Sequence, residues 1–486
     1  MRFLPCLLAA CLVFLPRAFA QNAPAPLPDL GDASGSELSL QTERRIGESI
    51  VRDIKFREPT YLDDPEVAEY LNGLGARLSN AGEGMRQDFE FFAIRETSIN
   101  AFAMPGGFIG VHTGLITAAD SESEIASVIA HEMAHVTQRH IARQIGIQKQ
   151  MQLPMMIAMA ASILLARSRP DLAGGAMAAV QGGAIQTQLS FSRDFEREAD
   201  RIGFQTLSAA GFDVRSMGTF FEKLQRYTQL LDSGSVPTYL RSHPVTTERI
   251  TDAQSRAQSM PYRQRADSLE YHLVRAKLRA EAGDVHEVVK TFGDAVNDRR
   301  FANEPGARYG LAVALLRARE PRRAEAQIAR LRADGIASPM VDTVAARVRL
   351  ELGDQAGALA ILKSALVRFP HRRPLLYAIL GTLQEQGRYD EVLATLAEPL
   401  RLYPRDPKLH EARAKAYAGQ GKRLLQHQAQ AEFYILQGSL PAAIEQLQLA
   451  QSSGDGNFYE LSAVDARLKE LRAEHARDLQ DAKKNR

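Results

Sequence analysis

Five consecutive residues, His131-Glu132-Met133-Ala134-His135, have the types and spacing of a metal-dependent catalytic motif. In an α-helix, residues i and i+4 lie on one face, so both imidazoles can reach the same metal ion. Glu132 projects about 100° further around the helix, beside the metal, where a carboxylate can accept a proton from metal-bound water. The pattern H-E-x-x-H therefore indicates a zinc site with a general base.

The residues around this motif predict the helix that it requires. Ile125, Ile129, Met133 and Val136 recur at helical spacing, which predicts a buried stripe. The acidic segment 120–124 supplies an N-cap and a first helical turn. These flanks favour a metal site over a chance pattern or a packed histidine pair.

A catalytic zinc needs a third protein ligand. In one known pattern a third His follows the second by six residues. His140 follows by five and, on a continuous helix, points about 140° away from His135. We therefore expect His140 to be a partly exposed helix residue. Another pattern takes a Glu from a second helix, for which Glu196 and Glu198 are candidates; Glu196 stands four residues before Asp200.

Four motifs resemble the HtpX and CAAX-prenyl-protease-like zinc metallopeptidase family, and they follow in that family's order. They are Asn100 to Gly107, His131 to His135, Glu196 to Asp200, and Ser242-His243-Pro244 with Arg249-Ile250. The resemblance implies that His131, His135 and Glu196 bind one zinc ion per chain and that Glu132 is the general base. It also implies that Asp200 orients a ligand His, whereas the spacing of Glu198 does not match the family.

The resemblance makes His243 a candidate active-site residue in a loop before a helix expected from about Thr246. Two roles stay open. His243 donates a hydrogen bond to the transition state, or it is a fourth zinc ligand in a resting form that displaces water and shuts the enzyme. Arg249 is its neighbour or its salt-bridge partner.

Upstream of the motif the sequence predicts helices over 40–55 and 65–81, a strand over 89–94, and a strand and turn over 106–114. A lone histidine at position 112 is expected to be structural.

In zinc peptidases of this general build, a strand beside the cleft pairs with the substrate backbone. The candidate edge runs from Asn100 to Val111. A sheet that only supports the helix is an equal alternative. The candidate substrate-binding residues are Asn100, Ala101, Phe102 and Ala103.

Residues 1–20 read as a secretory signal, with Arg2, an apolar run and a small-residue cleavage site. The segment from Leu8 to Cys11 resembles a lipoprotein box, but cleavage there would halve the apolar core, so a lipid anchor is less favoured. Both cysteines lie in this signal, so a chain cleaved after Ala20 needs no disulfide. A flexible lead-in is expected over 21–38.

The stretch 151–190 joins the two expected metal-binding helices. Its first piece, 153–166, is apolar all round, and an Ala/Gly-rich run follows; each piece is shorter than the ~20 residues that span a bilayer. The alternatives are a flap over the cleft, an apolar surface with peripheral membrane contact through 153–188, and an ordinary buried helical hairpin.

Beyond residue 262 the chain shows a period of 34 residues, which is typical of tetratricopeptide repeats. The period separates Gly353, Gly387 and Gly421, and also Pro370 and Pro404. We expect stacked helix pairs over 262–463, forming a solenoid whose concave side binds partners, and a charged helical tail over 464–486.

The composition supports more than one core, with 45% hydrophobic and 24% charged residues in a chain of 486. Residues 21–260 carry 22 basic and 29 acidic side chains, and residues 261–486 carry 36 and 29. The two parts attract each other, or the charges are simply solvated. Near-zero net charge argues against a nucleic-acid partner.

The predicted fold is an α+β, mostly helical zinc metallopeptidase domain of gluzincin-like type over 39–261, followed by an all-α tetratricopeptide solenoid. Together with the secretory signal, this resembles a group of Gram-negative periplasmic peptidases. The resemblance implies an endopeptidase and chaperone-like factor that degrades misfolded or stalled outer-membrane proteins and docks to their assembly machinery through the repeats. The alternative is a binding scaffold with latent or rare proteolysis, although a scaffold has no need of Glu132.

Overall fold

The computed structural model describes residues 38–82, 87–148, 192–230, 239–240 and 243–484. The predicted secretory signal, the lead-in up to residue 37 and the apolar stretch 151–190 lie outside these described residues. Among the described helices, none is long and apolar enough to cross a membrane.

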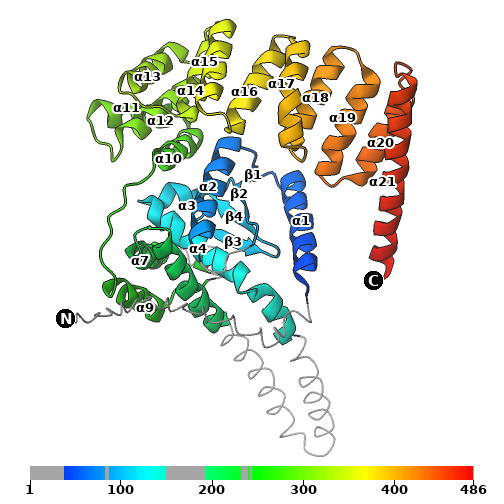
Figure 1. The fold of residues 1–486 in the computed structure, drawn as a ribbon. Helices are drawn as coiled ribbons and strands as arrows, with labels where there is room; N and C mark the ends of the chain where they lie inside the picture. The colour runs from blue at the N-terminus through cyan, green and yellow to red at the C-terminus, as the bar shows by residue number, and fades with distance from the viewer. Residues whose placement is uncertain (1–37, 83–86, 149–191, 231–238, 241–242, 485–486) are drawn as a thin grey trace, which may run out of the picture.

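A small sheet and the helices around it form the first part of the structure (Figure 1). The strand order is β1-β2-β4-β3, with β2 parallel and β3 antiparallel to β4, so β3 lies at an edge. The elements are α1 (Leu40–Arg57), β1 (Tyr61–Leu62), α2 (Pro65–Ala81), β2 (Glu90–Ile94), β3 (Ala101–Met104), β4 (Phe108–His112), α3 (Thr113–Ala118), α4 (Glu122–Thr137), α7 (Arg215–Leu230) and α9 (Thr247–Gln258).

These elements confirm the predicted helices over 40–55 and 65–81 and the predicted strand over 89–94. The segment 106–114 contains β4 and then the first residues of α3. The helix expected from Thr246 is α9, because the Thr246 side chain caps its N-terminus.

Helix α4 carries the H-E-x-x-H motif and is buried on nearly every side. The side chain of Ser121 accepts the N–H of Glu124, and the Glu124 carboxylate accepts the N–H of Asp120, so the helix begins with a reciprocal cap. The predicted stripe is buried, with its four residues 6% exposed or less. Since α4 contacts β3, α2 and α7, the motif lies on a firmly packed element.

The second part is an array of antiparallel helix pairs that curves over the first part (Figure 1). Gly353, Gly387 and Gly421 lie in its turns with φ of +82°, +67° and +72°, which confirms the turns predicted from the period. The tail helix begins earlier than predicted. The helices are α10 (Leu269–Glu281), α11 (Val285–Asn297), α12 (Glu304–Arg317), α13 (Pro321–Ala333), α14 (Pro339–Glu351), α15 (Gln355–Arg368), α16 (Arg373–Glu385), α17 (Tyr389–Leu402), α18 (Pro407–Gly419), α19 (Arg423–Leu436), α20 (Leu440–Gln451) and α21 (Phe458–Lys484).

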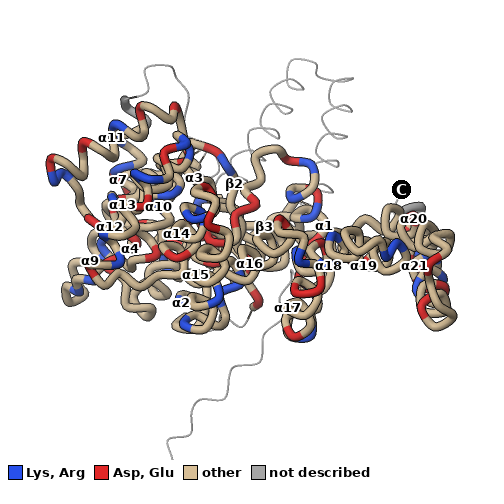
Figure 2. Tube along the Cα trace, turned by 90° about the horizontal axis from the view of Figure 1, so that it is seen from above, with Lys and Arg blue, Asp and Glu red and all other residues tan. Residues whose placement is uncertain are grey.

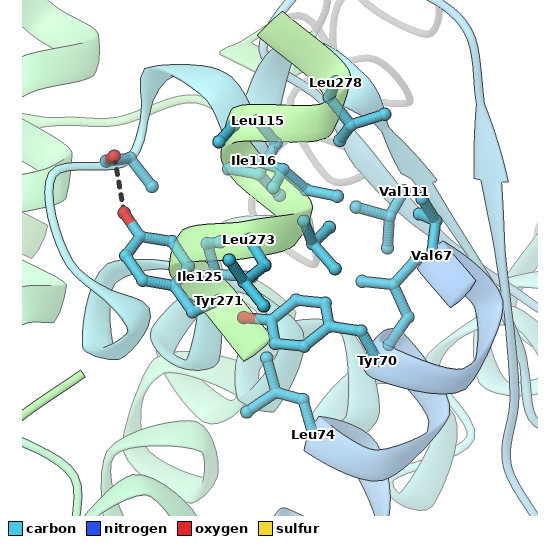
Figure 3. Packing of buried hydrophobic residues seen from close by; sticks show 14 of the residues in the cluster. Val67, Tyr70, Leu74, Val111, Leu115, Ile116, Ile125, Tyr271, Leu273 and Leu278 are labelled. Atoms are coloured by element: carbon cyan, nitrogen blue, oxygen red, sulfur yellow. Dashed lines mark hydrogen bonds between the residues drawn. The ribbon is translucent and has the colours of Figure 1, made fainter. Parts of the chain in front are cut away.

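Helix α10 joins the two parts through a shared core. Figure 3 shows Tyr271, Leu273 and Leu278 of α10 packed beside Tyr70 of α2 and Leu115 of α3. The Tyr271 hydroxyl donates to the backbone carbonyl that follows α3, at 2.8 Å. One buried apolar cluster therefore extends from the first part into the first repeats.

Charged residues of both signs are interspersed along the helices of the described chain (Figure 2). Particular ion pairs connect the two parts: Lys277 contacts Asp64 and Glu66 of the first part, and Lys408 contacts Asp63. Local ion pairs of this kind link the two parts, whereas the other charged residues of both signs are mixed along the helices.

Candidate metal centre

Four side chains from three segments converge on one buried point: His131 and His135 from α4, Glu196 from the helix over 192–209, and His243 from the segment before α9. One ligand atom from each lies within 4.8 Å of the others. His131 is 1% exposed, Glu196 5% and His243 8%, so these polar groups face each other and hardly any solvent.

The spacing of these atoms fits a tetrahedral metal ion. His131 Nε2 lies 3.0 Å from His135 Nε2 and 3.4 Å from His243 Nδ1. Glu196 Oε1 lies 3.3 Å from His135 Nε2 and 2.8 Å from His243 Nδ1. Ligand atoms about 2.0–2.1 Å from a tetrahedral zinc lie about 3.3 Å apart. Three imidazole nitrogens and a carboxylate oxygen are also a donor set that zinc prefers.

Asp200 and Arg249 hold the far side of this group. His131 Nδ1 lies 2.9 Å from Asp200 Oδ1, and the Arg249 guanidinium binds both oxygens of Asp200 at 2.6 and 2.7 Å. Arg249 also contacts Glu196 Oε2 at 2.8 Å and donates to the Pro244 carbonyl. The sequence left the partner of Arg249 open; the structure places it on the two carboxylates.

Burial and hydrogen bonding shift the pKa values of these groups in opposite directions: hydrogen bonding prevails at His131 and Glu196, and burial prevails at His135. Burial alone lowers the pKa of His131, but hydrogen bonds to Asp200 and Glu196 raise this pKa to about 10. Burial lowers the pKa of His135 to about 3. Burial raises the pKa of Glu196, but three histidine hydrogen bonds outweigh it and hold this pKa well below its usual range.

Glu132 lies beside the group, fully buried. Its Oε2 accepts the backbone N–H of Ala103 on β3 at 3.0 Å. Its Oε1 has no hydrogen-bond partner among the described residues, and His243 Nε2 lies 3.4 Å from it. Burial raises the pKa of Glu132, which suits a group that exchanges protons. Tyr239 stacks on the ring of His243, with centroids 4.8 Å apart.

The expectation for His140 was wrong. His140 is 3% exposed, and its Nδ1 lies 2.9 Å from His135 Nδ1. The 140° argument assumed a continuous helix, but α4 ends at Thr137, and Arg139 adopts a φ of +53° before helical structure resumes at 140. This break turns the His140 ring back towards His135. Burial lowers the pKa of His140 to about 4.

Glu198 lies apart from the four converging side chains, because its carboxylate contacts His140 Nε2 at 3.2 Å and Arg143 Nη1 at 2.8 Å. Sequence reasoning considered Glu198 only as a rival ligand. A polar i, i+2, i+4 series on one helix, Glu196-Glu198-Asp200, was the available indication that the helix meets two different neighbours.

The candidate substrate-binding residues lie on or next to edge strand β3. Asn100 is 6% exposed and Ala101 is fully buried, whereas Phe102 and Ala103 are half-buried. His112 bonds Ser98 at 2.8 Å and approaches the Asn100 amide at 3.4 Å, and it lies outside the converging group.

Comparison with known proteins places two segments in families. Residues 64–257 match Peptidase family M48, and residues 349–416 match the tetratricopeptide repeat. The chain is 32% identical to the β-barrel assembly-enhancing protease of Yersinia pestis over 92% of this chain and 91% of that protein. It is also 32% identical to the β-barrel assembly-enhancing protease of Escherichia coli K12, over 94% of this chain and 93% of that protein. It is 38% identical to the putative β-barrel assembly-enhancing protease of Vibrio cholerae over 67% of this chain and 66% of that protein.

Proposed function

The chain belongs to peptidase family M48, within the group of the β-barrel assembly-enhancing proteases, and we propose its function from this membership. The protein is a zinc-dependent endopeptidase of the periplasm that degrades misfolded or stalled outer-membrane proteins and assists their assembly. As a member of this family the chain is a metalloendopeptidase. The observation that carries the proposal is the buried His131, His135, Glu196 and His243 group with Glu132 beside it.

In the proposed site His131, His135 and Glu196 hold zinc, and His243 is a fourth ligand in a resting form. When bound, such an ion lowers the pKa of water and polarises a carbonyl group. Four protein ligands leave no position for water, so a site of this kind is closed until one ligand leaves. His243 is the candidate to leave, because its two ring nitrogens face Glu196 and Glu132, so the ring has a second polar partner outside the metal group.

Glu132 is the proposed general base. The N–H of Ala103 fixes one carboxylate oxygen, and the other is buried without a hydrogen bond among the described residues. That oxygen takes the proton of the attacking water and later gives it to the leaving amine nitrogen. Once displaced from the metal group, His243 donates a hydrogen bond to the oxyanion.

Strand β3 is the proposed substrate edge. In its antiparallel pairing with β4, alternate backbone groups point away from the sheet. The N–H of Ala103 reaches Glu132, so this outward side faces the site. Phe102 and Ala103 are the accessible part of the proposed edge. Main-chain pairing accepts many sequences, as a protease of unpaired outer-membrane β-strands requires.

The repeat array is the proposed docking part for the outer-membrane assembly machinery, with unfolded or misassembled outer-membrane proteins as substrates. Support comes from the names of the relatives and from the match to a repeat type that binds proteins. The signal-like residues 1–20 support export to the periplasm.

The test is zinc content and casein cleavage by the purified chain, beside Glu132→Gln and His243→Ala. Gln keeps an oxygen for the Ala103 N–H but cannot accept a proton, so Glu132→Gln should bind zinc and lose cleavage by at least about 100-fold. His243→Ala should cleave faster than wild type if closing the site is the larger effect of His243, and more slowly if its hydrogen bond to the oxyanion is the larger effect.

Two results would count against the proposal. Cleavage by Glu132→Gln at the wild-type rate would show that Glu132 is not the general base. Zinc in all three proteins with cleavage by none would favour the scaffold alternative, in which the repeats carry the function.

A further inference from the structure

His131 and His135 of the metal group each have a second ring nitrogen, and each of these two nitrogens has a polar partner. For His131 the partner is Asp200, which Arg249 holds through two hydrogen bonds. For His135 the partner is another histidine: His135 Nδ1 lies 2.9 Å from His140 Nδ1.

The series of contacts that starts at His135 continues beyond His140. His140 Nε2 lies 3.2 Å from Glu198 Oε2, and the same oxygen accepts from Arg143 Nη1 at 2.8 Å. His131 thus contacts a carboxylate directly and His135 reaches one through His140, and each of these carboxylates binds an arginine. Asp200 and Glu198 both come from the helix that carries Glu196.

The contacts from His135 through His140 to Glu198 allow one consistent placement of the protons. A neutral imidazole has one N–H, and a nitrogen that faces a metal must be unprotonated. His135 directs Nε2 into the metal group, so its proton is on Nδ1 and is donated to His140 Nδ1. The proton of His140 is then on Nε2, where the Glu198 carboxylate accepts it.

Packing holds His140 in the orientation that this order needs. Its ring stacks on Phe195 with centroids 4.5 Å apart and an interplanar angle of 16°. The Arg143 guanidinium lies 4.7 Å from the centroid of the Phe195 ring. Phe195 directly precedes Glu196, so the backbone that places the third ligand also places the surface against which His140 rests.

We propose that His140, supported by Glu198 and Arg143, is a positioning residue of the metal site: it accepts the Nδ1–H of His135 and so fixes the tautomer and ring orientation of that ligand. The inference rests on the metal site of the proposed function. Groups that hold the outer nitrogen of a ligand histidine typically contribute 10- to 100-fold to metal affinity.

The test compares His140→Asn and His140→Phe in the full chain, with zinc affinity measured by competition against a chromophoric chelator. Asn places an oxygen where Nδ1 accepts, whereas Phe keeps the stacking on Phe195 and removes the acceptor. We expect zinc affinity to fall about 10- to 100-fold in His140→Phe and to be partly restored in His140→Asn. His427→Phe, in the repeat array, is the control for the same exchange away from the site and should bind zinc as wild type does.

A role in packing alone predicts the opposite order, with His140→Phe near wild type and His140→Asn weaker, and that order would overturn the inference. If circular dichroism shows that His140→Phe does not fold, Glu198→Leu tests the same series of contacts at its Glu198 end. Glu198→Leu should weaken zinc binding more than Glu198→Gln, which keeps an acceptor, and equal affinity in both would overturn the inference. Failure of wild type to bind zinc would instead refute the proposed function itself.

Discussion

Replacing Lys277 by Met should destabilise the junction between the two parts of the chain. Lys277 on α10 contacts Asp64 at 2.5 Å and Glu66 at 2.7 Å, and the three side chains are only 14%, 11% and 8% exposed. One ammonium group thus neutralises two buried carboxylates. Attraction to these carboxylates outweighs burial and raises the pKa of Lys277, so it stays charged.

The size of the effect follows from this burial. Removing one partner of a buried ion pair leaves an uncompensated charge and costs about 3–5 kcal/mol. Lys408 offers a matched control, because it also joins the two parts, through Asp63 at 2.6 Å, but these side chains are 33% and 60% exposed. Lys408→Met should therefore cost less than about 1 kcal/mol.

The cost of Lys277→Met should also depend on pH. Burial raises the pKa of Glu66, and the attraction of Lys277 opposes that rise. Without Lys277 the pKa rises further. A carboxyl whose folded pKa exceeds its unfolded value destabilises the fold while ionised, so the penalty grows as pH rises through the folded pKa. We expect a larger penalty at pH 8 than at pH 5.

Urea unfolding followed by circular dichroism measures these differences in free energy, and the core shared by the first part and the first repeats should make them unfold together. Adding Glu66→Gln to Lys277→Met should recover part of the loss at pH 8, because it removes one buried charge. Equal costs for Lys277→Met and Lys408→Met, or a penalty that is the same at both pH values, would refute the reasoning.

Four further changes test other features of the fold by urea unfolding. Tyr271→Phe leaves a buried backbone carbonyl without its donor and should cost about 1–3 kcal/mol; an unchanged midpoint would contradict the contact. Gly353→Ala places a side chain at a φ of +82° and should cost about 1–2 kcal/mol. Gly293→Ala, inside α11 with open space around the new Cβ, should stabilise by about 0.5–1 kcal/mol, and the same sign for both would count against the turn geometry. Burial lowers the pKa of His410, whose Nδ1 faces Arg413, so His410 gains its proton at a lower pH in the folded chain than in the unfolded chain. Because an unfolded histidine gains a proton below about pH 6.5, stability should fall as pH drops through that value, and His410→Gln should show a smaller slope than wild type.

Much of the fold was predictable because its causes are local. The i, i+4 spacing of His131 and His135 and the cap at Ser121 depend only on helix geometry, so α4 could be predicted from one segment. The repeat turns were equally accessible, since a residue such as Gly387 at positive φ recurs with the period of its helix pair. The order of the four family motifs indicated Glu196 and His243 without showing how they meet.

The sequence by itself determined the metal-binding helix, the repeat architecture and the types of the groups that converge. Only the tertiary structure decided how these groups are supported. His131 and His243 stand 112 residues apart, and their contact requires the whole first part to fold. The break that turns His140 towards His135 depends on Arg139, whose left-handed backbone is held by an ion pair to Glu43 of α1, 96 residues away. A non-glycine residue adopts this conformation only when distant contacts offset its local cost, and no pattern around position 139 records those contacts.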